Sequence, residues 1–275
     1  MEYSELKAFA REVRVNIVNS IASIGSGHIG GSLSIVEVLT LLYKKHMNID
    51  PRNPRMAGRD RLVCSKGHAG PAVYAVLAEM GYFDKSELLT LNQNGTRLPS
   101  HCDMNKTPGI DMTAGSLGQG LSCAVGIAIG ARQKKDGARC YCIIGDGESQ
   151  EGQIWEAALF AAKMKLDNLI VFTDYNKQQL DGPTAEINPL DPLPDKWKAF
   201  GWNVYNVKDG NDLQELDAAI IAAKANVGKP SMIIMNTVKG KGICFVENNK
   251  GGCHSMSISC EQKECAINEI RGAIC

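Results

Sequence analysis

Short apolar runs alternate with helical patterns along this 275-residue chain, and that alternation restricts its fold more than any other feature. Several of the runs are continuous, as expected for strands buried on both faces of a parallel sheet. The runs are RLVCS (61–65), RCYCII (139–144), NLIVFTD (168–174), WNVYNV (202–207) and SMIIMN (231–236). Strands and helices in alternation imply right-handed crossovers, so we expect an α/β fold with a doubly wound, mainly parallel sheet in three α/β/α layers.

Apolar residues at three- and four-residue spacing predict the helices that cover this sheet. They fall at residues 3–23, 70–80, 117–133, 150–164 and 213–225. Ser34 followed by Glu37 predicts a capping box that opens a further helix up to about His46, itself expected at a solvated helix end. The Pro-rich span 188–195 predicts a long surface loop. Without a repeat or an interdomain linker, residues 1–275 are expected to form a single domain.

Charge and hydropathy exclude several classes of protein. Thirty basic and thirty acidic residues cancel, and no basic stripe is present, so we expect small-molecule partners and no nucleic acid. The start, MEYSELKAFAREVR, lacks the apolar segment of a secretion signal. The longest apolar run, LSCAVGIAIGA, is too short to span a membrane. We therefore expect a cytoplasmic protein with no membrane association.

Ten cysteines are present. Cys140 and Cys142 alternate along a predicted buried strand, and Cys123 lies in a small-residue helix, so we expect them to be reduced apolar fillers. The cysteines of the tail lack the CxxC pairs of zinc sites, and we expect neither a metal nor a disulfide among them. They are Cys253, Cys260, Cys265 and Cys275.

The segment Gly145-Asp146-Gly147 comes where a predicted buried strand ends, and Asn176 follows the next strand. In doubly wound sheets, ligands bind beyond the carboxyl ends of the strands. The glycines let backbone N–H groups approach an anion, whereas a bare aspartate repels a phosphate unless a divalent cation lies between them. Carboxylate and amide oxygens suit Mg²⁺. Gly-Asp-Gly also makes ordinary turns, so the spacing of thirty residues to Asn176 carries the prediction.

With this spacing, the sequence resembles the transketolases, a family of thiamine-diphosphate enzymes. Further motifs occur in family order: SGHIGGSLS (26–34), RDRLVCSKGHAGPAVYA (59–75), LPSHCDMNKTPGIDMTAGSLGQG (98–120), GDGESQEGQIWEAA (145–158), DYNKQQLDG (174–182), and KGKGICFVENN (239–249) with His254. Transketolases continue into a pyrimidine-binding domain and a C-terminal domain that this sequence lacks. The resemblance is therefore to the N-terminal subunit of a split transketolase with the thiamine-diphosphate-binding fold.

The resemblance implies a cofactor site for thiamine diphosphate and Mg²⁺, with Ca²⁺ or Mn²⁺ as substitutes. The metal ligands are the side chains of Asp146 and Asn176 and the backbone carbonyl of Gln178. The other positions that match cofactor-binding motifs are His68, Gly115, Ser116, Leu117, Gly145, Gly147 and Glu148. Close helix packing through small residues is the alternative for the segment 115–118.

The resemblance also implies catalytic residues. His28 and His101 contact the donor sugar, and His254 helps to deprotonate the hydroxyl whose carbon is cleaved. Glu151 and Glu156 belong to a proton relay across the subunit interface. The alternatives are structural hydrogen bonds for the histidines and interaction with the helix dipole for the glutamates.

The function implied is transfer of a two-carbon ketol unit from a ketose, bearing phosphate or another anionic group, to an aldose. Activity would require a partner subunit with the pyrimidine-binding and C-terminal domains, in a heterotetramer of two copies each. One alternative is the alpha chain of a 2-oxoacid dehydrogenase, which lacks the SGHxGG and SKGHA histidines. Another is a non-catalytic thiamine-diphosphate-binding protein. The sequence does not identify the donor and acceptor sugars.

Overall fold

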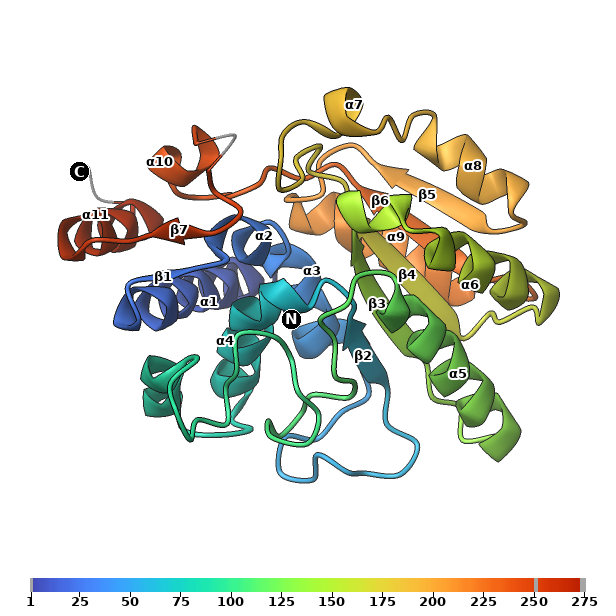
Figure 1. Ribbon diagram of the computed structural model, residues 1–275. Helices are drawn as coiled ribbons and strands as arrows, with labels where there is room; N and C mark the ends of the chain where they lie inside the picture. Colours follow the sequence, from blue (N-terminus) through green and yellow to red (C-terminus); the bar gives the residue numbers. More distant parts are fainter. Residues whose placement is uncertain (1, 250–251, 273–275) are drawn as a thin grey trace.

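The centre of the protein is a sheet of five parallel strands in the order β2-β3-β4-β6-β5 (Figure 1). The computed structural model describes residues 2–249 and 252–272. The strands are β2 (Arg61–Cys64), β3 (Cys140–Gly145), β4 (Leu169–Asp174), β5 (Asn203–Val207) and β6 (Ser231–Met235). Each lies in one of the five predicted apolar runs, so the prediction of a parallel α/β sheet is confirmed.

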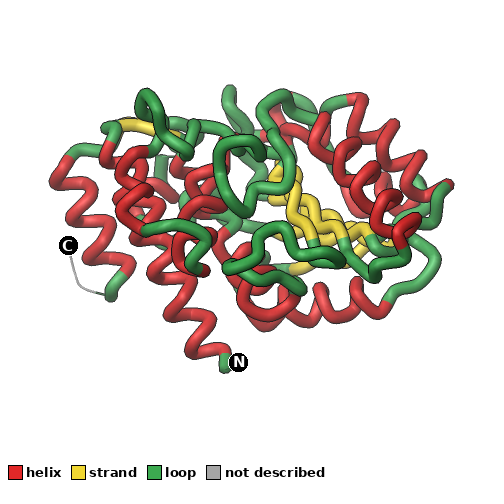
Figure 2. The backbone as a smooth tube through the Cα atoms, turned by 90° about the horizontal axis from the view of Figure 1, so that it is seen from below, coloured by secondary structure: helices red, strands yellow, loops and turns green. Residues whose placement is uncertain are grey.

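Helices cover both faces of this sheet (Figures 1 and 2). The long ones are α1 (Tyr3–Ser23), α4 (Gly70–Met80), α5 (Gln119–Lys134), α6 (Gly152–Lys163) and α9 (Leu213–Ala225), each within two residues of a predicted helix. The shorter ones are α2 (Ile29–Leu33), α3 (Val36–Leu41), η1 (Leu42–His46), η2 (Gly67–Ala69), η3 (Lys85–Thr90), η4 (Gly147–Gln150), α7 (Thr184–Ile187), α8 (Leu193–Ala199), α10 (Cys244–Glu247) and α11 (Cys260–Ile270).

Alternate side chains of β3 belong to two separate hydrophobic cores. Cys140, Cys142 and Ile144 pack with apolar residues of α5, α6 and α8. Tyr141 and Ile143 point to the other face and pack with α1, α3, α4 and α9. All five are fully buried, as the continuous apolar run predicts. Cys140 and Cys142 are free thiols, in agreement with their prediction as apolar fillers.

The predicted capping box at Ser34 is wrong. Ser34 is the residue that follows α2, and its hydroxyl donates to the carbonyl of Gly31 and to the carboxylate of Asp174, 2.7 Å away. Glu37 instead pairs with Arg14 at 2.7 Å. The spacing of a capping box is present, but partners from distant parts of the chain bind both side chains.

The prediction that His46 is solvated is also wrong. Its side chain is buried, and Nε2 lies 2.7 Å from a carboxylate oxygen of Asp217 in α9. The same carboxylate accepts from Tyr3 and Lys45 at 2.6 Å. This cluster joins α1, η1 and α9.

Two expectations about the second half of the chain also need correction. The Pro-rich span is a loop only as far as Pro192, because α8 begins at Leu193. Cys265 is disulfide-bonded, contrary to the expectation for the tail, whereas Cys253 and Cys260 are free and Cys275 lies outside the described residues. In the described part of the chain, no helix combines the length and apolar character needed to cross a membrane.

A second, two-stranded sheet was not predicted from the sequence. β1 (Ser26–Gly27) pairs antiparallel with β7 (Met256–Ser257), in the register Ser26 with Ser257. α11 follows β7 and packs on α1. The pairing returns the end of the chain to its first motif, so that His254 and His28 lie near each other.

Candidate active site

The segments after β3 and β4 meet at the carboxyl edge of the sheet. Gly145 and Asp174 are in register on these neighbouring strands. The carboxylate of Asp146 accepts the backbone N–H of Lys177 at 2.5 Å, and the side-chain oxygen of Asn176 accepts the backbone N–H of Gln178 at 3.1 Å. Adjacent parallel strands therefore bring Asp146 and Asn176 together, as the sequence predicted.

Lys177 gives this turn its shape. Its backbone φ angle is 64°, in the left-handed region that residues other than glycine rarely adopt. This conformation lies between Asn176 and Gln178 and directs the Lys177 N–H at Asp146. Such backbone conformations persist where surrounding contacts hold them, and they concentrate at functional sites.

Asp174, the fully buried last residue of β4, orients the side chain of Asn176. Its carboxylate accepts hydrogen bonds from Asn176 Nδ2 at 2.9 Å and from Lys66 Nζ and Thr237 Oγ1 at 2.5 Å each. Ser34 supplies a fourth bond. Because Nδ2 of Asn176 is held by Asp174, its Oδ1 faces the turn at Gln178.

The two buried aspartates differ in pKa. Burial, followed by the charge of Asp174, raises the pKa of Asp146 to about 7. Burial also disfavours ionised Asp174, but the charge and hydrogen bond of Lys66 outweigh it and hold the pKa of Asp174 below its usual value. Asp174 therefore has its cation within the protein, whereas the charge on Asp146 is compensated mainly by backbone N–H groups.

Four histidines from distant segments converge beside this turn. The ring of His28 lies 5.5 Å from those of His68 and His101 and 5.3 Å from that of His254, between centroids. His68 and His254 are 4.8 Å apart. These two line a cavity of about 290 Å³ together with the predicted metal ligands Asp146, Asn176 and Gln178. The histidines thus form one group next to those ligands.

Burial lowers the pKa of His28, His68, His101 and His254, which favours the neutral imidazole near pH 7. The positive charges of Lys239 and Lys66 also lower the pKa of His254, which falls to about 4. A neutral imidazole can donate one hydrogen bond and accept another, which suits contact with hydroxyl groups.

Residues 6–269 match the family described as "Transketolase, thiamine diphosphate binding domain". The chain belongs to the transketolase family. It is 55% identical over 266 residues to the 6-deoxy-6-sulfo-D-fructose transketolase subunit SqwG of Clostridium sp. (strain MSTE9), a match that covers 97% of this chain and 96% of that protein. It is 41% identical to an apulose-4-phosphate transketolase subunit of Actinobacillus succinogenes, with 98% of each chain covered.

Full-length transketolases match over less than half their length. The chain is 37% identical to human transketolase and covers 42% of it. Among solved structures, transketolase from Leishmania mexicana superposes with a TM-score of 0.90 at 30% identity, and that from Campylobacter jejuni with 0.91 at 29%. These matches cover 98% and 100% of this chain but 41% and 44% of the solved chains. The transketolase fold predicted from the sequence is confirmed.

The family's cofactor can be tested against the residues of this site. Asp146, the Oδ1 atom of Asn176 and the carbonyl of Gln178 are hard oxygen donors that meet at one turn, as Mg²⁺ requires. The side-chain Oε1 of Gln178 is buried without a hydrogen-bond partner among the described residues. Gly147 lies so close to Gln179 that an added Cβ would approach that side chain to 3.0 Å. The donors and the close backbone approach fit a metal-bound diphosphate.

Lys239 is a site residue that the sequence reasoning missed. Its buried ammonium donates to the backbone carbonyl of Gln178 at 3.0 Å and lies 3.5 Å from Nδ1 of His254. Burial lowers its pKa. In the sequence it opens the KGKG segment, where a lysine among glycines could have been singled out as an anion ligand. Its position gives this cavity a cation in addition to Lys66.

Glu148, a predicted cofactor position, supports the site from within the protein. Glu148 is buried, and its carboxylate accepts the N–H groups of Gly118 and Gly145 at 2.9 Å and the hydroxyl of Ser65. Burial raises the pKa of Glu148. These bonds tie the segment before α5 to the end of β3, and a direct contact of Glu148 with the cofactor stays a prediction.

The segment Gly115-Ser116-Leu117 is exposed at the rim of the site. Leu117 lines the same cavity as Asp146, and a Cβ on Gly115 would lie 3.9 Å from the His101 ring. Ser116 lies between them and does not line the cavity. The structure therefore places Gly115 and Leu117 beside the histidines, and a contact of Ser116 with the cofactor stays a prediction.

Glu151 and Glu156 lie in different hollows. Glu151, the N-cap residue of α6, lines the cavity of the histidines. Glu156 lies in a groove of about 310 Å³ between α5 and α6, beside Ile129 and Phe160. Both glutamates are exposed at the surface of the chain. A proton relay that includes them stays a prediction.

Proposed function

We propose that this chain is the N-terminal subunit of a split transketolase, which transfers a two-carbon ketol unit from a ketose to an aldose. The observation that carries the proposal is the convergence of four neutral histidines beside the turn of Asp146 and Asn176. A thiamine-diphosphate-binding protein without sugar chemistry has no need of so many hydroxyl-binding side chains at its cofactor. The histidines therefore also favour this function over that of a 2-oxoacid dehydrogenase chain.

In this proposal, Asp146, Asn176 and the carbonyl of Gln178 hold Mg²⁺, with Ca²⁺ or Mn²⁺ as substitutes. When bound, thiamine diphosphate supplies a nucleophilic carbon and an electron sink for cleavage of a C–C bond. Lys239, now hydrogen-bonded to Gln178, provides positive charge for the diphosphate. The backbone of Gly147 and the ring of His68 contact its oxygens.

The other histidines act on the sugar. His28 and His101 form hydrogen bonds with hydroxyl groups of the donor and hold it in place. His254 accepts the proton of the hydroxyl whose carbon is cleaved. Its pKa of about 4 keeps the ring in the neutral form that can accept a proton.

The exposed apolar side chains near the site support a partner subunit. Leu180 is 62% exposed at the rim of the cavity, and Leu159 and Phe160 of α6 are 59% and 46% exposed beside the groove of Glu156. Large apolar side chains of this exposure suit burial against another chain. The partner would carry the pyrimidine-binding and C-terminal domains, and two copies of each chain would form a heterotetramer in the cytoplasm.

The substrate we infer is a ketose whose terminal carbon carries an anionic group. Among the relatives, one is named as a 6-deoxy-6-sulfo-D-fructose transketolase and another as an apulose-4-phosphate transketolase. The higher identity, 55% against 41%, favours a sulfonated ketose as the donor of this chain.

The first test mixes the chain with its partner, identified as the polypeptide that copurifies with it. We expect no ketol transfer by the chain alone, because it spans less than half the length of full-length transketolases, and full activity in the mixture. Mass in solution should give two copies of each chain. The donors are 6-deoxy-6-sulfo-D-fructose and xylulose 5-phosphate, with ribose 5-phosphate as acceptor. Turnover by this chain alone would overturn the split-subunit proposal.

A second test concerns His101. In the complex, His101→Ala should lower kcat/KM for every donor about 10- to 100-fold, since the lost hydrogen bond is to the sugar. Affinity for thiamine diphosphate, measured by calorimetry, should change less than about threefold. Gln133→Ala, at an exposed residue near the end of α5, is the control for overall stability. Unaltered kinetics would leave His101 with a structural role only.

A further inference from the structure

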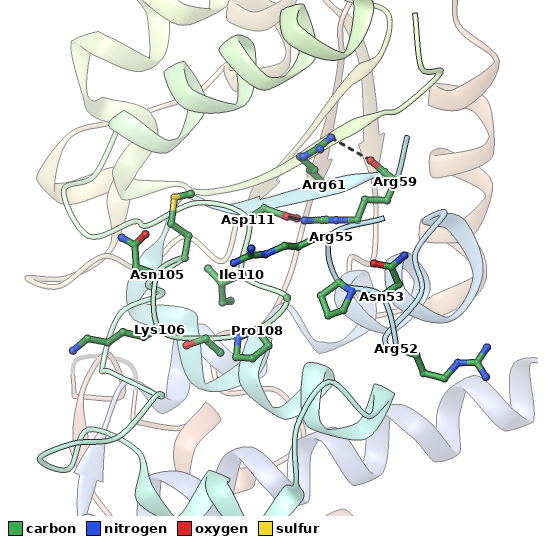
Figure 3. Close-up of a pocket in the computed structure, with 14 residues that line it drawn as sticks. Arg52, Asn53, Arg55, Arg59, Arg61, Asn105, Lys106, Pro108, Ile110 and Asp111 are labelled. Carbon is green, nitrogen blue, oxygen red and sulfur yellow. Dashed lines mark hydrogen bonds and ion pairs between the residues drawn. The ribbon is translucent and has the colours of Figure 1, made fainter. Parts of the chain in front are cut away.

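A second hollow lies away from the histidines, at the amino end of β2. Two segments, 52–61 and 104–111, form a pocket of about 770 Å³ (Figure 3). Its volume is within the range of small-molecule sites. The active site lies beyond the carboxyl ends of the strands, so the two sites occupy opposite ends of β2.

The pocket is strongly basic. Five cationic side chains line it against one carboxylate, a net charge of +4. They are Arg52, Arg55, Arg59, Arg61 and Lys106, and the carboxylate is Asp111. The whole chain has a net charge of zero, so this concentration of charge is local.

Both oxygens of the one carboxylate in the pocket already have partners within the protein. One oxygen of Asp111 pairs with Arg59, and the other accepts the backbone N–H of Leu62 at 2.9 Å. The bond between Arg59 and Asp111 forms the inner wall, and the Nε of Arg59 is buried without a hydrogen-bond partner among the described residues. Arg61 donates to the carbonyl of Arg59 at 3.3 Å.

Arg55 and Lys106 supply free positive charge. Neither side chain has a hydrogen bond or ion pair with any residue in the described ranges 2–249 and 252–272. In Figure 3, Arg55 extends over the Arg59–Asp111 pair, and Lys106 lies at the rim, on the opposite segment. Apolar side chains of Pro54, Pro108 and Ile110 complete the wall. Arg55 and the Arg59–Asp111 pair therefore lie in the middle of a hollow that also offers contacts for a carbon skeleton, with Lys106 and Arg52 at its edges.

We propose that this pocket binds a small molecule carrying two phosphate groups. Arg52 pairs with Asp50 outside the pocket at 3.6 Å, which leaves a charge of +3 from the other lining side chains, and two phosphate groups carry a charge of about −3 to −4 near pH 7. Guanidinium groups bind phosphate through two parallel N–H bonds, and arginine supplies four of the five cations. The pocket would be a second ligand site, apart from the site for cofactor and sugar.

The segment 104–111 also connects the two sites along the chain. The chain runs from His101 in the active site through this segment and back to the active site at Gly115. The backbone N–H of Ala114 donates to the carbonyl of Cys102 at 3.1 Å and so joins the two ends of the loop. A ligand held by Lys106 and Arg55 joins this loop to the segment before β2. Binding should therefore also stabilise the loop that begins at His101.

Calorimetry on the intact chain tests the proposal, with EDTA present to keep anions from a metal site. The probes are fructose 1,6-bisphosphate and ADP, which separate distant from adjacent phosphates, and inorganic phosphate. We expect micromolar binding of one of the first two, and inorganic phosphate at least tenfold weaker. Arg55→Ala and Lys106→Ala should each weaken binding about tenfold or more. Neither side chain has a partner to lose within the described ranges, so both variants should fold.

Two controls locate the binding. Lys163→Ala removes an exposed lysine of α6 and should leave the affinity for the bisphosphate within about twofold of the parent. Asp146→Ala alters the cofactor turn, at the opposite end of the sheet, and should also leave this affinity unchanged. The proposal is overturned if neither fructose 1,6-bisphosphate nor ADP binds below millimolar concentration, if Arg55→Ala and Lys106→Ala bind like the parent, or if inorganic phosphate binds as tightly as the bisphosphate.

Discussion

Replacing Asp146 by alanine should reduce Mg²⁺-dependent binding of thiamine diphosphate at least about 100-fold in the complex of the two subunits. Asp146 is the only carboxylate among the three oxygen donors of the turn, since the others are an amide oxygen and a backbone carbonyl. In the proposed site, the variant removes the one anionic protein ligand of the metal, and the charge of the diphosphate is then compensated by lysine side chains alone. Calorimetry with and without Mg²⁺ measures the loss directly.

Asp146→Asn separates charge from hydrogen bonding in this experiment. An asparagine carries no charge and keeps one oxygen, which can still accept the N–H of Lys177, 2.5 Å from the carboxylate, while the bond from the N–H of Gly147 to the other oxygen is lost. It should therefore disturb the turn less than alanine does and bind the cofactor almost as poorly as the alanine variant. Asp195→Asn, at an exposed aspartate of α8, is the matched control. Parent-like affinity in Asp146→Asn would remove Asp146 from the metal site.

The sheet and the approach of Asp146 to Asn176 could be predicted from the sequence because their signals are local. A continuous apolar run specifies a doubly buried strand, and the residue that follows it lies at the carboxyl edge whatever its partners. Asp146 and Asn176 needed only the further assumption that their strands are neighbours, which the register confirms. Each step uses a window of a few residues.

Features that depend on distant partners were missed. His254 was predicted with the other histidines, but the pairing of two-residue strands that brings it to them was missed, because such strands are too short for any periodicity. His46 carries the sequence environment of a solvated helix end, yet Asp217, 171 residues away, draws it into the protein. Ser34 and Glu37 have the spacing of a capping box, but Asp174 and Arg14 bind them more strongly.

The buried ion pair of Lys66 and Asp174 joins residues far apart in the sequence and was also not predicted. Replacing its lysine should strongly lower the stability of the protein. Lys66 is only 2% exposed, and its ammonium lies 2.5 Å from Asp174 and 2.9 Å from the carbonyl of Gly31. Lys66→Met keeps most of the volume but leaves Asp174 as a buried charge without its cation. The free energy of unfolding should fall by about 3–5 kcal/mol. At about 2–4 °C per kcal/mol for a domain near this size, Tm should fall by about 10 °C.

A double variant distinguishes loss of charge compensation from loss of packing. Lys66→Met with Asp174→Asn removes both charges, while the asparagine oxygen can still accept one of the bonds that Thr237 and Asn176 donate to the two oxygens of Asp174. If the uncompensated carboxylate causes the instability, the double variant should recover more than half of the lost Tm, and denaturant unfolding should show the same order. The exposed Lys163→Met is the control for methionine itself. A loss below about 1 kcal/mol in Lys66→Met, or no recovery in the double variant, would show that the charges of the pair do not stabilise the turn. In that case, the hydrogen bonds from Ser34 and Thr237 would hold Asp174, which in turn orients Asn176.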